Sequence, residues 1–139
     1  MMSLTRRYRF SASHRLHTPS LSEERNTELY GKCNNPFGHG HDYAIEVQVA
    51  GRVDPRTGVV VDLGRMDRLV RDAVIDAFDH RNLNTDVAEF RDRVPTTENL
   101  VVEAGARLQR AWREEFGITP ALERIRIHET ARNTVELSL

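Results

Sequence analysis

The sequence has few of the features that mark secreted, membrane-spanning or nucleic-acid-binding proteins. Among its 139 residues there is one cysteine, Cys33, so no disulfide can form within the chain and a reducing cytoplasm is the expected location. No apolar run approaches the ~20 residues of a membrane span, and the N-terminus lacks the apolar core of a secretory signal. Because 20 Lys and Arg face 21 Asp and Glu, there is no overall charge to hold nucleic acid or an anionic membrane.

Repeats, low-complexity tracts and Ser/Gly linkers are also absent, as is a Gly-rich dinucleotide-binding motif. The length suits one hydrophobic core, since single domains usually span ~100 to 200 residues. We therefore expect a single domain over residues 1–139 that needs no nicotinamide or flavin.

Strands are indicated by apolar side chains at every second position. Residues 8–16 and 39–50 show this alternation, which is typical of strands with one buried face. The turn-forming residues 54–58 predict a hairpin in which residues 59–61 return as the partner of the second strand. The alternation resumes over 125–129 and again over 135–139.

Two helices are predicted between these pairs of strands. Asp62 suits the cap of a helix whose apolar residues recur at three and four positions and which ends near Asp79. Residues 95–98 offer a cap and an acidic first turn for a second helix, which Gly117 closes. The order β-β-α-α-β-β predicts an α+β domain with two helices on one face of an antiparallel four-stranded sheet. Strands at both ends of the chain leave open edges, from which we expect a homo-oligomer.

Three of the six histidines lie on predicted apolar strand faces. His39 and His41 are two residues apart and share one face, and His14 belongs to the first strand. Three imidazoles can hold zinc and leave a fourth position open to water or substrate. The alternative is that each ring is a core or surface histidine with ordinary hydrogen-bond partners, and the spacing alone does not decide between the two.

Cys33 and the Asp79-His80 pair each fit more than one role. Cys33 lies among Gly and Asn residues that predict a loop, and it fits a small buried side chain, a fourth zinc ligand, or a nucleophile or general base. The Asp79 carboxylate either orients the His80 imidazole or only marks the end of a helix.

Two further acidic segments are ambiguous in the same way. Glu129 shares the parity of core-facing strand residues, so its carboxylate needs either an ion-pair partner or a ligand to anchor. Thr96, Thr97 and Glu98 are first of all a helix cap.

Seven short motifs follow one another between residues 10 and 130. They are Phe10-Ser11-Ala12-Ser13-His14-Arg15-Leu16, Gly31-Lys32-Cys33-Asn34-Asn35-Pro36, Gly38-His39-Gly40-His41-Asp42-Tyr43, Asp54-Pro55-x-Thr57-Gly58, Asp79-His80-x-Asn82-Leu83, Thr96-Thr97-Glu98-Asn99 and Glu129-Thr130. Each is weak alone, but the ordered set closely resembles the 6-pyruvoyltetrahydropterin synthases and the related 6-carboxytetrahydropterin synthases. The Asn-Asn-Pro segment and the spacing between Cys33 and His39 favour the pyruvoyl branch.

The resemblance implies a set of site residues. Zinc would be bound by His14, His39 and His41, and a proton-transfer triad would consist of Cys33, Asp79 and His80, with the thiol and the Asp-His pair contributed by different subunits. Glu129 would hold the pterin through charge-assisted hydrogen bonds, in a pocket lined by Thr96, Thr97 and Glu98. The family has the T-fold, in which trimers close a barrel and pair into a homohexamer, so the active sites would lie at subunit interfaces.

The implied reaction converts the small-molecule substrate 7,8-dihydroneopterin triphosphate to 6-pyruvoyltetrahydropterin, with elimination of triphosphate and Zn²⁺ as cofactor. One alternative is a 6-carboxytetrahydropterin synthase of queuosine or deazapurine biosynthesis, acting on the same substrate. Two others are a metal-independent Cys-His hydrolase that uses Cys33, His80 and Asp79, and a binding module in which Cys33 is the fourth ligand of a structural zinc.

Overall fold

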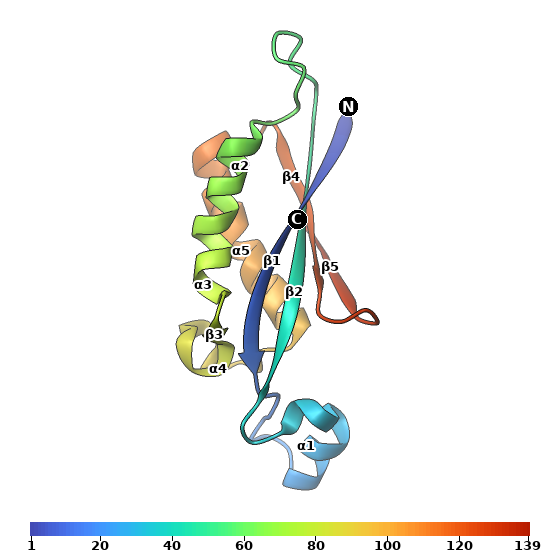
Figure 1. Cartoon of the computed structure of the whole chain (residues 1–139), viewed down its shortest axis with the longest axis vertical. Helices are drawn as coiled ribbons and strands as arrows, with labels where there is room; N and C mark the ends of the chain where they lie inside the picture. Colours follow the sequence, from blue (N-terminus) through green and yellow to red (C-terminus); the bar gives the residue numbers. More distant parts are fainter.

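A pair of long strands forms the centre of the computed structural model, which describes the whole chain, residues 1–139. β1 (Met2–His14) and β2 (His39–Gly51) are antiparallel along their full length, from His14 opposite His39 to Met2 opposite Gly51. β4 (Ala121–His128) pairs with the other edge of β2, and β5 (Thr134–Ser138) pairs with β4. Figure 1 shows these strands side by side, and they confirm the four predicted antiparallel strands.

The sheet also has a fifth strand that the sequence did not predict. β3 (Arg81–Asn82) pairs in parallel with β1 at Ala12 and Ser13, so the sheet is mixed and has the order β3-β1-β2-β4-β5. The prediction that residues 59–61 form a strand and pair with β2 is wrong. Both edges of β2 are occupied, by β1 and β4, which leaves residues 59–61 no edge of β2 to pair with.

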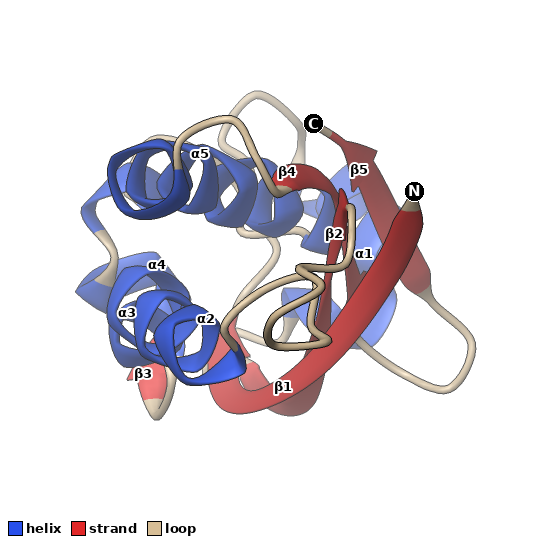
Figure 2. Ribbon diagram, turned by 90° about the horizontal axis from the view of Figure 1, so that it is seen from above, coloured by secondary structure: helices blue, strands red, loops and turns tan.

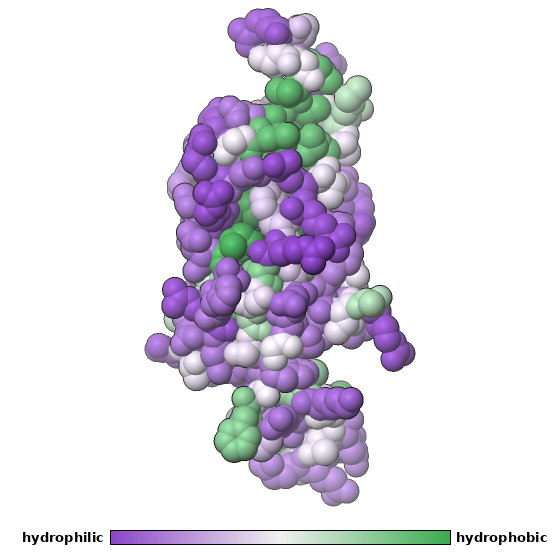
Figure 3. All heavy atoms as spheres, viewed as in Figure 1, coloured by the Kyte–Doolittle hydropathy of each residue, from purple (hydrophilic) through white to green (hydrophobic).

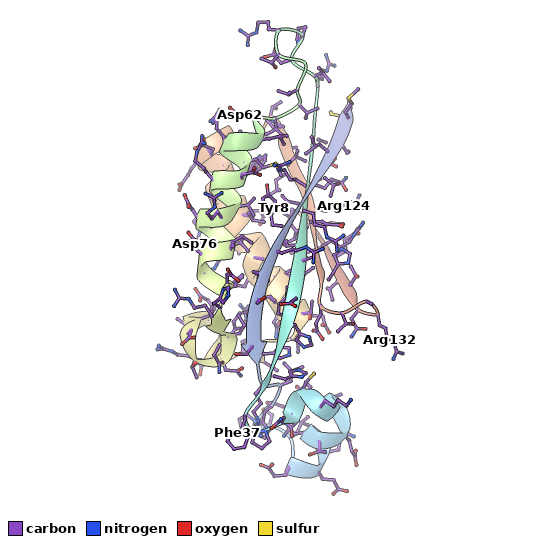
Figure 4. All side chains as sticks on the ribbon, in the orientation of Figure 1. Tyr8, Phe37, Asp62, Asp76, Arg124 and Arg132 are labelled. Atoms are coloured by element: carbon purple, nitrogen blue, oxygen red, sulfur yellow. The ribbon has the colours of Figure 1, made fainter.

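The first predicted helix is confirmed, with a change of hydrogen-bond pattern in its middle. α2 (Leu63–Val70) continues through a π-helical turn, η2 (Arg71–Ile75), into α3 (Asp76–Phe78). The Asp62 side chain caps it by accepting a hydrogen bond from the backbone N–H of Arg65 at 3.1 Å. Asp62 lies at the start of α2 in Figure 4.

The second predicted helix, α5 (Thr97–Phe116), is confirmed at both ends. The Thr96 hydroxyl accepts a hydrogen bond from the backbone N–H of Asn99 at 3.1 Å, and Gly117 ends the helix with a φ of 72°. Both long helical segments lie on one face of the curved sheet (Figure 2). The arrangement is the predicted α+β architecture.

Four short helical segments were not predicted. They are α1 (Glu23–Tyr30), η1 (Gly31–Asn34), α4 (Leu83–Asp86) and η3 (Ala88–Phe90). Residues 15–38, here called the α1 lobe, project beyond the end of β1 and β2 in Figure 1. α1 escaped prediction because it lacks an apolar stripe, and its one buried residue is Asn26.

The hydrophobic core fills the space between the sheet and the two long helical segments. Ile45 and Val47 of β2, Ile125 of β4 and Leu100 of α5 are fully buried there. The opposite sheet face is polar, with Arg126 of β4 paired to Glu46 of β2 and Glu136 of β5. Most of the surface visible in Figure 3 is likewise hydrophilic. None of the helices is long and apolar enough to cross a membrane.

β1 starts at Met2, before the apolar alternation that begins at Tyr8. Within this extension, Arg6 forms an ion pair with α2 where an apolar contact would be expected. Arg6 donates two hydrogen bonds to the Asp67 carboxylate of α2, at 2.7 and 2.9 Å, and the Tyr8 hydroxyl donates a third at 2.9 Å. The Arg6 guanidinium holds the pKa of Asp67 below its usual value. This contact ties the N-terminal half of β1 to the helical layer.

We predict that Asp67→Asn lowers the melting temperature by a few degrees at pH 7, because a bidentate charged contact is lost. A carboxyl pKa that is lowered by folding stabilises the protein above the unfolded value of about 3.9, and this contribution is lost as the pH falls through the folded pKa. The difference between variant and wild type should therefore shrink below about pH 4, as measured by thermal unfolding across a pH series.

Asp72→Asn is the matched control, since Asp72 is exposed on the same helical segment and has no ion-pair partner. This variant should melt within about one degree of wild type, as expected of a surface change. Equal losses in the two variants, or a difference that persists unchanged at pH 3, would show that the Asp67 contact does not stabilise β1.

Candidate active site

Three imidazoles converge at one end of the β1–β2 pair, on the face covered by the helices. The Nε2 atom of His39 lies 3.1 Å from Nε2 of His14 and 3.2 Å from Nε2 of His41. The register explains this convergence, because His14 is opposite His39 and Ala12 is opposite His41. Strand alternation then directs all three rings to the same face.

The three rings fit a zinc ion. Ligands placed tetrahedrally at ~2.0 to 2.1 Å from zinc are about 3.3 Å apart, which is close to the observed nitrogen separations. The buried His14 ring donates its Nδ1 proton to the carbonyl oxygen of Pro95 at 2.9 Å, so its Nε2 presents a lone pair to the cluster. Burial lowers the pKa of both His14 and His41, which favours the neutral form that binds metal.

The Cys33 thiol belongs to the same cluster. The Sγ atom and one nitrogen of each of His14, His39 and His41 all lie within 4.8 Å of one another. Cys33 is half-buried in η1, and burial, followed by the charge of Glu129, raises the pKa of its thiol. The structure therefore brings together four residues that the sequence placed on three separate segments.

Asparagine side chains hold the α1 lobe together and so fix the segment that carries Cys33. Asn26 is fully buried, and its amide donates to the carbonyl oxygens of Thr18, Leu21 and Ser22 at 2.9 to 3.2 Å. The Asn34 amide, next to Cys33, donates to the Leu16 carbonyl at 2.8 Å.

The backbone beside the first histidine has an asparagine anchor of its own. Asn84 of α4 accepts a hydrogen bond from the Arg15 backbone N–H at 2.7 Å and donates one to the Arg15 carbonyl at 2.9 Å. Sequence reasoning missed these roles of Asn26, Asn34 and Asn84, because asparagine in a polar stretch signals only a turn.

Glu129 lies beside the histidines, at the end of β4. One of its carboxylate oxygens is 3.6 Å from Nε2 of His41, and the other accepts a hydrogen bond from the buried Thr97 hydroxyl. Of the other two residues in the predicted pocket segment, Thr96 is used as the cap of α5, and Glu98 is exposed without a contact to the cluster. Tyr43, which the sequence did not single out, is buried with its hydroxyl 3.4 Å from Nδ1 of His14.

The Asp79-His80 pair is formed but lies outside this cluster. Nδ1 of His80 is 3.0 Å from an Asp79 carboxylate oxygen, and the other oxygen accepts a hydrogen bond from the Ser11 backbone N–H at 2.9 Å. That backbone hydrogen bond, more than the imidazole, holds the pKa of Asp79 below its usual value. The pair stands beside β1, and no hydrogen bond links it to Cys33 within one chain.

Comparison with known proteins identifies one family over nearly the whole chain. Residues 3–138 match the family described as 6-pyruvoyl tetrahydropterin synthase. The chain is 46% identical over 132 residues to the 6-pyruvoyl tetrahydrobiopterin synthase of Poecilia reticulata, covering 95% of this chain and 86% of the relative. It is similar to the solved structure of Caenorhabditis elegans 6-pyruvoyl tetrahydropterin synthase, with a TM-score of 0.87, 37% identity and coverage of 99% and 95% of the two chains. A 6-carboxy-5,6,7,8-tetrahydropterin synthase of Rickettsia conorii is 32% identical over 80 residues, covering 58% of this chain and 49% of the relative.

Gly38 packs directly against the backbone of His14, so a substitution there tests the geometry of the cluster. It has a φ of 72°, and a Cβ added to it would lie 2.8 Å from the His14 carbonyl oxygen. We predict that Gly38→Ala displaces His14 relative to His39 and weakens zinc binding by about tenfold or more, the usual effect of disturbing the support of a metal ligand. Competition with a chromophoric zinc chelator measures this affinity.

Gly58 supplies the control, because it has a φ of 75° in a distant loop and nothing within 4 Å of an added Cβ. Gly58→Ala carries the same backbone penalty of roughly 1 to 2 kcal/mol without the clash. It should bind zinc as wild type does; equal loss of affinity in both variants would mean that the contact with His14 is irrelevant.

Proposed function

Because the chain belongs to the 6-pyruvoyl tetrahydropterin synthase family, we propose that it is a zinc-dependent enzyme that converts 7,8-dihydroneopterin triphosphate to 6-pyruvoyltetrahydropterin and triphosphate. The observation that carries this proposal is the convergence of three imidazole Nε2 atoms beside a thiol and a carboxylate on one sheet face. Metal ligands, a candidate proton acceptor and an anchor for a polar ring then adjoin one another, as an isomerisation driven by proton transfers requires.

His14, His39 and His41 would hold the zinc ion. A zinc ion bound there would supply Lewis-acid chemistry, making the carbon-bound protons beside the substrate hydroxyl groups easier to remove. The Pro95 carbonyl orients the His14 ring and fixes its proton on Nδ1.

Cys33 would remove a side-chain proton as the general base. Its raised thiol pKa means that the thiolate needs a nearby positive charge, and a dication held by the three imidazoles would provide one. His80 would relay protons, since Asp79 binds its Nδ1 and leaves Nε2 free to exchange one. The Glu129 carboxylate, steadied by the Thr97 hydroxyl, would accept hydrogen bonds from the N–H groups of the pterin ring.

This division of labour requires more than one chain. Cys33 and the Asp79-His80 pair are not in contact within a single chain, so His80 would have to come from a neighbouring subunit. The sheet also has unpaired edges at β5 and along most of β1, where β3 pairs with only two residues. Assembly into a homohexamer would cover these edges and complete the site.

The alternatives receive less support. The match to a 6-carboxy-5,6,7,8-tetrahydropterin synthase covers a little over half of the chain, whereas the pyruvoyl relatives match nearly all of it. A Cys-His-Asp hydrolase needs its thiol and imidazole within hydrogen-bond reach. Here Cys33 lies with the zinc-binding candidates, and His80 contacts Asp79.

Incubation of the purified protein with 7,8-dihydroneopterin triphosphate is the direct test. We expect release of triphosphate and formation of 6-pyruvoyltetrahydropterin, identified by mass spectrometry. Removal of metal by a chelator should abolish turnover, and added zinc should restore it. A 6-carboxy product would replace the proposed function by that of the related branch, and turnover that survives chelation would contradict a role for zinc.

Variants separate the metal ligands from the base. Cys33→Ala should retain zinc and lower kcat by about a hundredfold or more, in line with the loss of a general base. His39→Ala should lose most of the bound zinc, whereas His128→Ala, on the opposite sheet face beside Glu46, should retain both zinc and activity. Elemental analysis and steady-state kinetics provide the two measurements. Loss of zinc in Cys33→Ala would instead identify Cys33 as a fourth ligand.

A further inference from the structure

Ser11 of β1 is the centre of the contacts that hold the Asp79-His80 pair. Its backbone N–H donates to an Asp79 carboxylate oxygen at 2.9 Å, and its carbonyl accepts a hydrogen bond from the His80 backbone N–H at 2.6 Å. Its hydroxyl donates to the Asp42 carboxylate on β2 at 2.5 Å. Ser11 thus forms hydrogen bonds with Asp79, His80 and Asp42.

His80 depends on these contacts because little else fixes it. It has a φ of 59°, the one positive φ among the non-glycine residues, and its side chain is 83% exposed. A non-glycine residue in this conformation persists only where the surrounding structure imposes it. The Ser11 backbone and the Asp79 carboxylate are the groups that do so, since packing contributes little to so exposed a ring.

Asp42 reaches the pair from the neighbouring strand. Ser11 and Asp42 are direct cross-strand partners on the face opposite the three imidazoles, and within the chain the Ser11 hydroxyl is the hydrogen-bond partner of Asp42. Asp42 and His80 also line one polar cavity of about 350 Å³ together with Ser11, Ser13, Arg81 and Asn82. A hydrogen bond to a carboxylate is stronger than one to a neutral acceptor, so Asp42 restrains Ser11 more firmly than a neutral side chain would.

We propose that Asp42 is a positioning residue for the proton relay, acting through the Ser11 hydroxyl to hold Asp79 and His80 in place. Asp42 restrains Ser11, and the two main-chain hydrogen bonds of Ser11 set where the Asp79 carboxylate and the His80 backbone lie. The inference rests on the proposed function only in assigning His80 to proton transfer. The effect of the contact between Asp42 and Ser11 on the position of the Asp79-His80 pair does not depend on which reaction the protein catalyses.

Steady-state kinetics of four single variants and one double variant tests the proposal. Ser11→Ala and Asp42→Ala each remove the hydrogen bond, and both should lower kcat about fivefold to tenfold with KM within about twofold, because a loosened relay slows proton transfer without weakening substrate binding. The double variant should be no slower than either single variant, since all three break one contact. Ser11→Thr keeps the donor and Asp42→Asn keeps an acceptor, although a weaker, neutral one. Both variants should therefore lose less kcat than the alanine variants and stay within about twofold of wild type.

Hydrogen exchange supplies a readout that does not need activity. The His80 amide bonds to the Ser11 carbonyl, so peptides spanning residues 78–82 should exchange faster in Ser11→Ala and Asp42→Ala than in wild type. Zinc content should be unchanged in both. Loss of zinc from Asp42→Ala would overturn the proposal, because it would show that Asp42 acts by positioning the adjacent His41 and not the Asp79-His80 pair.

The outcomes separate the two hypotheses. A wild-type protein without turnover on 7,8-dihydroneopterin triphosphate would refute the proposed function, and the exchange rates would still decide whether Asp42 restrains the pair. Normal turnover in wild type, together with unchanged kcat and unchanged exchange in both alanine variants, would refute the positioning role alone. Additive losses in the double variant would also contradict it, because Ser11 and Asp42 would then act separately.

Discussion

The register between β1 and β2 is the constraint on which the candidate site depends. Pairing that runs from Met2–Gly51 to His14–His39 fixes which side chains share a face. It places three imidazoles on the core side and sets Ser11 opposite Asp42 on the other side. A shift of one residue would exchange the two faces and would send both histidines of β2 away from His14. The convergence of the imidazoles and the contact between Ser11 and Asp42 are therefore two outcomes of one strand pairing.

Much of this arrangement was visible in the sequence because it follows strong periodic signals. The alternation around His14, His39 and His41 predicted inward-facing rings, and the caps at Asp62 and Thr96 located two helices. Local patterns could not reveal β3, a two-residue strand that forms only because the end of α3 delivers it to the edge of β1. For the same reason the predicted hairpin at residues 59–61 failed, since its signal was local and the competing partners of β2 were distant in sequence.

The candidate site was harder to predict than the fold because hydrogen bonds to backbone atoms assemble much of it. The Pro95 carbonyl binds the His14 ring, and the Asn84 side chain forms hydrogen bonds with both backbone groups of Arg15. Next to Cys33, the Asn34 amide donates to the Leu16 carbonyl. Such contacts have no periodicity and can be satisfied by many residue types. The histidines and the cysteine of the candidate site were therefore recognisable in the sequence, whereas the residues that hold them in place emerged from the fold.

The thiol and the three imidazoles lie in parts of the chain that are stabilised by different interactions. The histidines belong to strands that are continuous with the hydrophobic core, whereas the α1 lobe has Asn26 as the one buried residue of its helix. Segments held mainly by hydrogen bonds open more readily than segments anchored by apolar packing. Local opening of the lobe would withdraw Cys33 from the cluster and leave the three imidazoles assembled. The convergence of the three imidazoles and the position of the thiol are thus separate properties of this protein, set by different regions of its sequence.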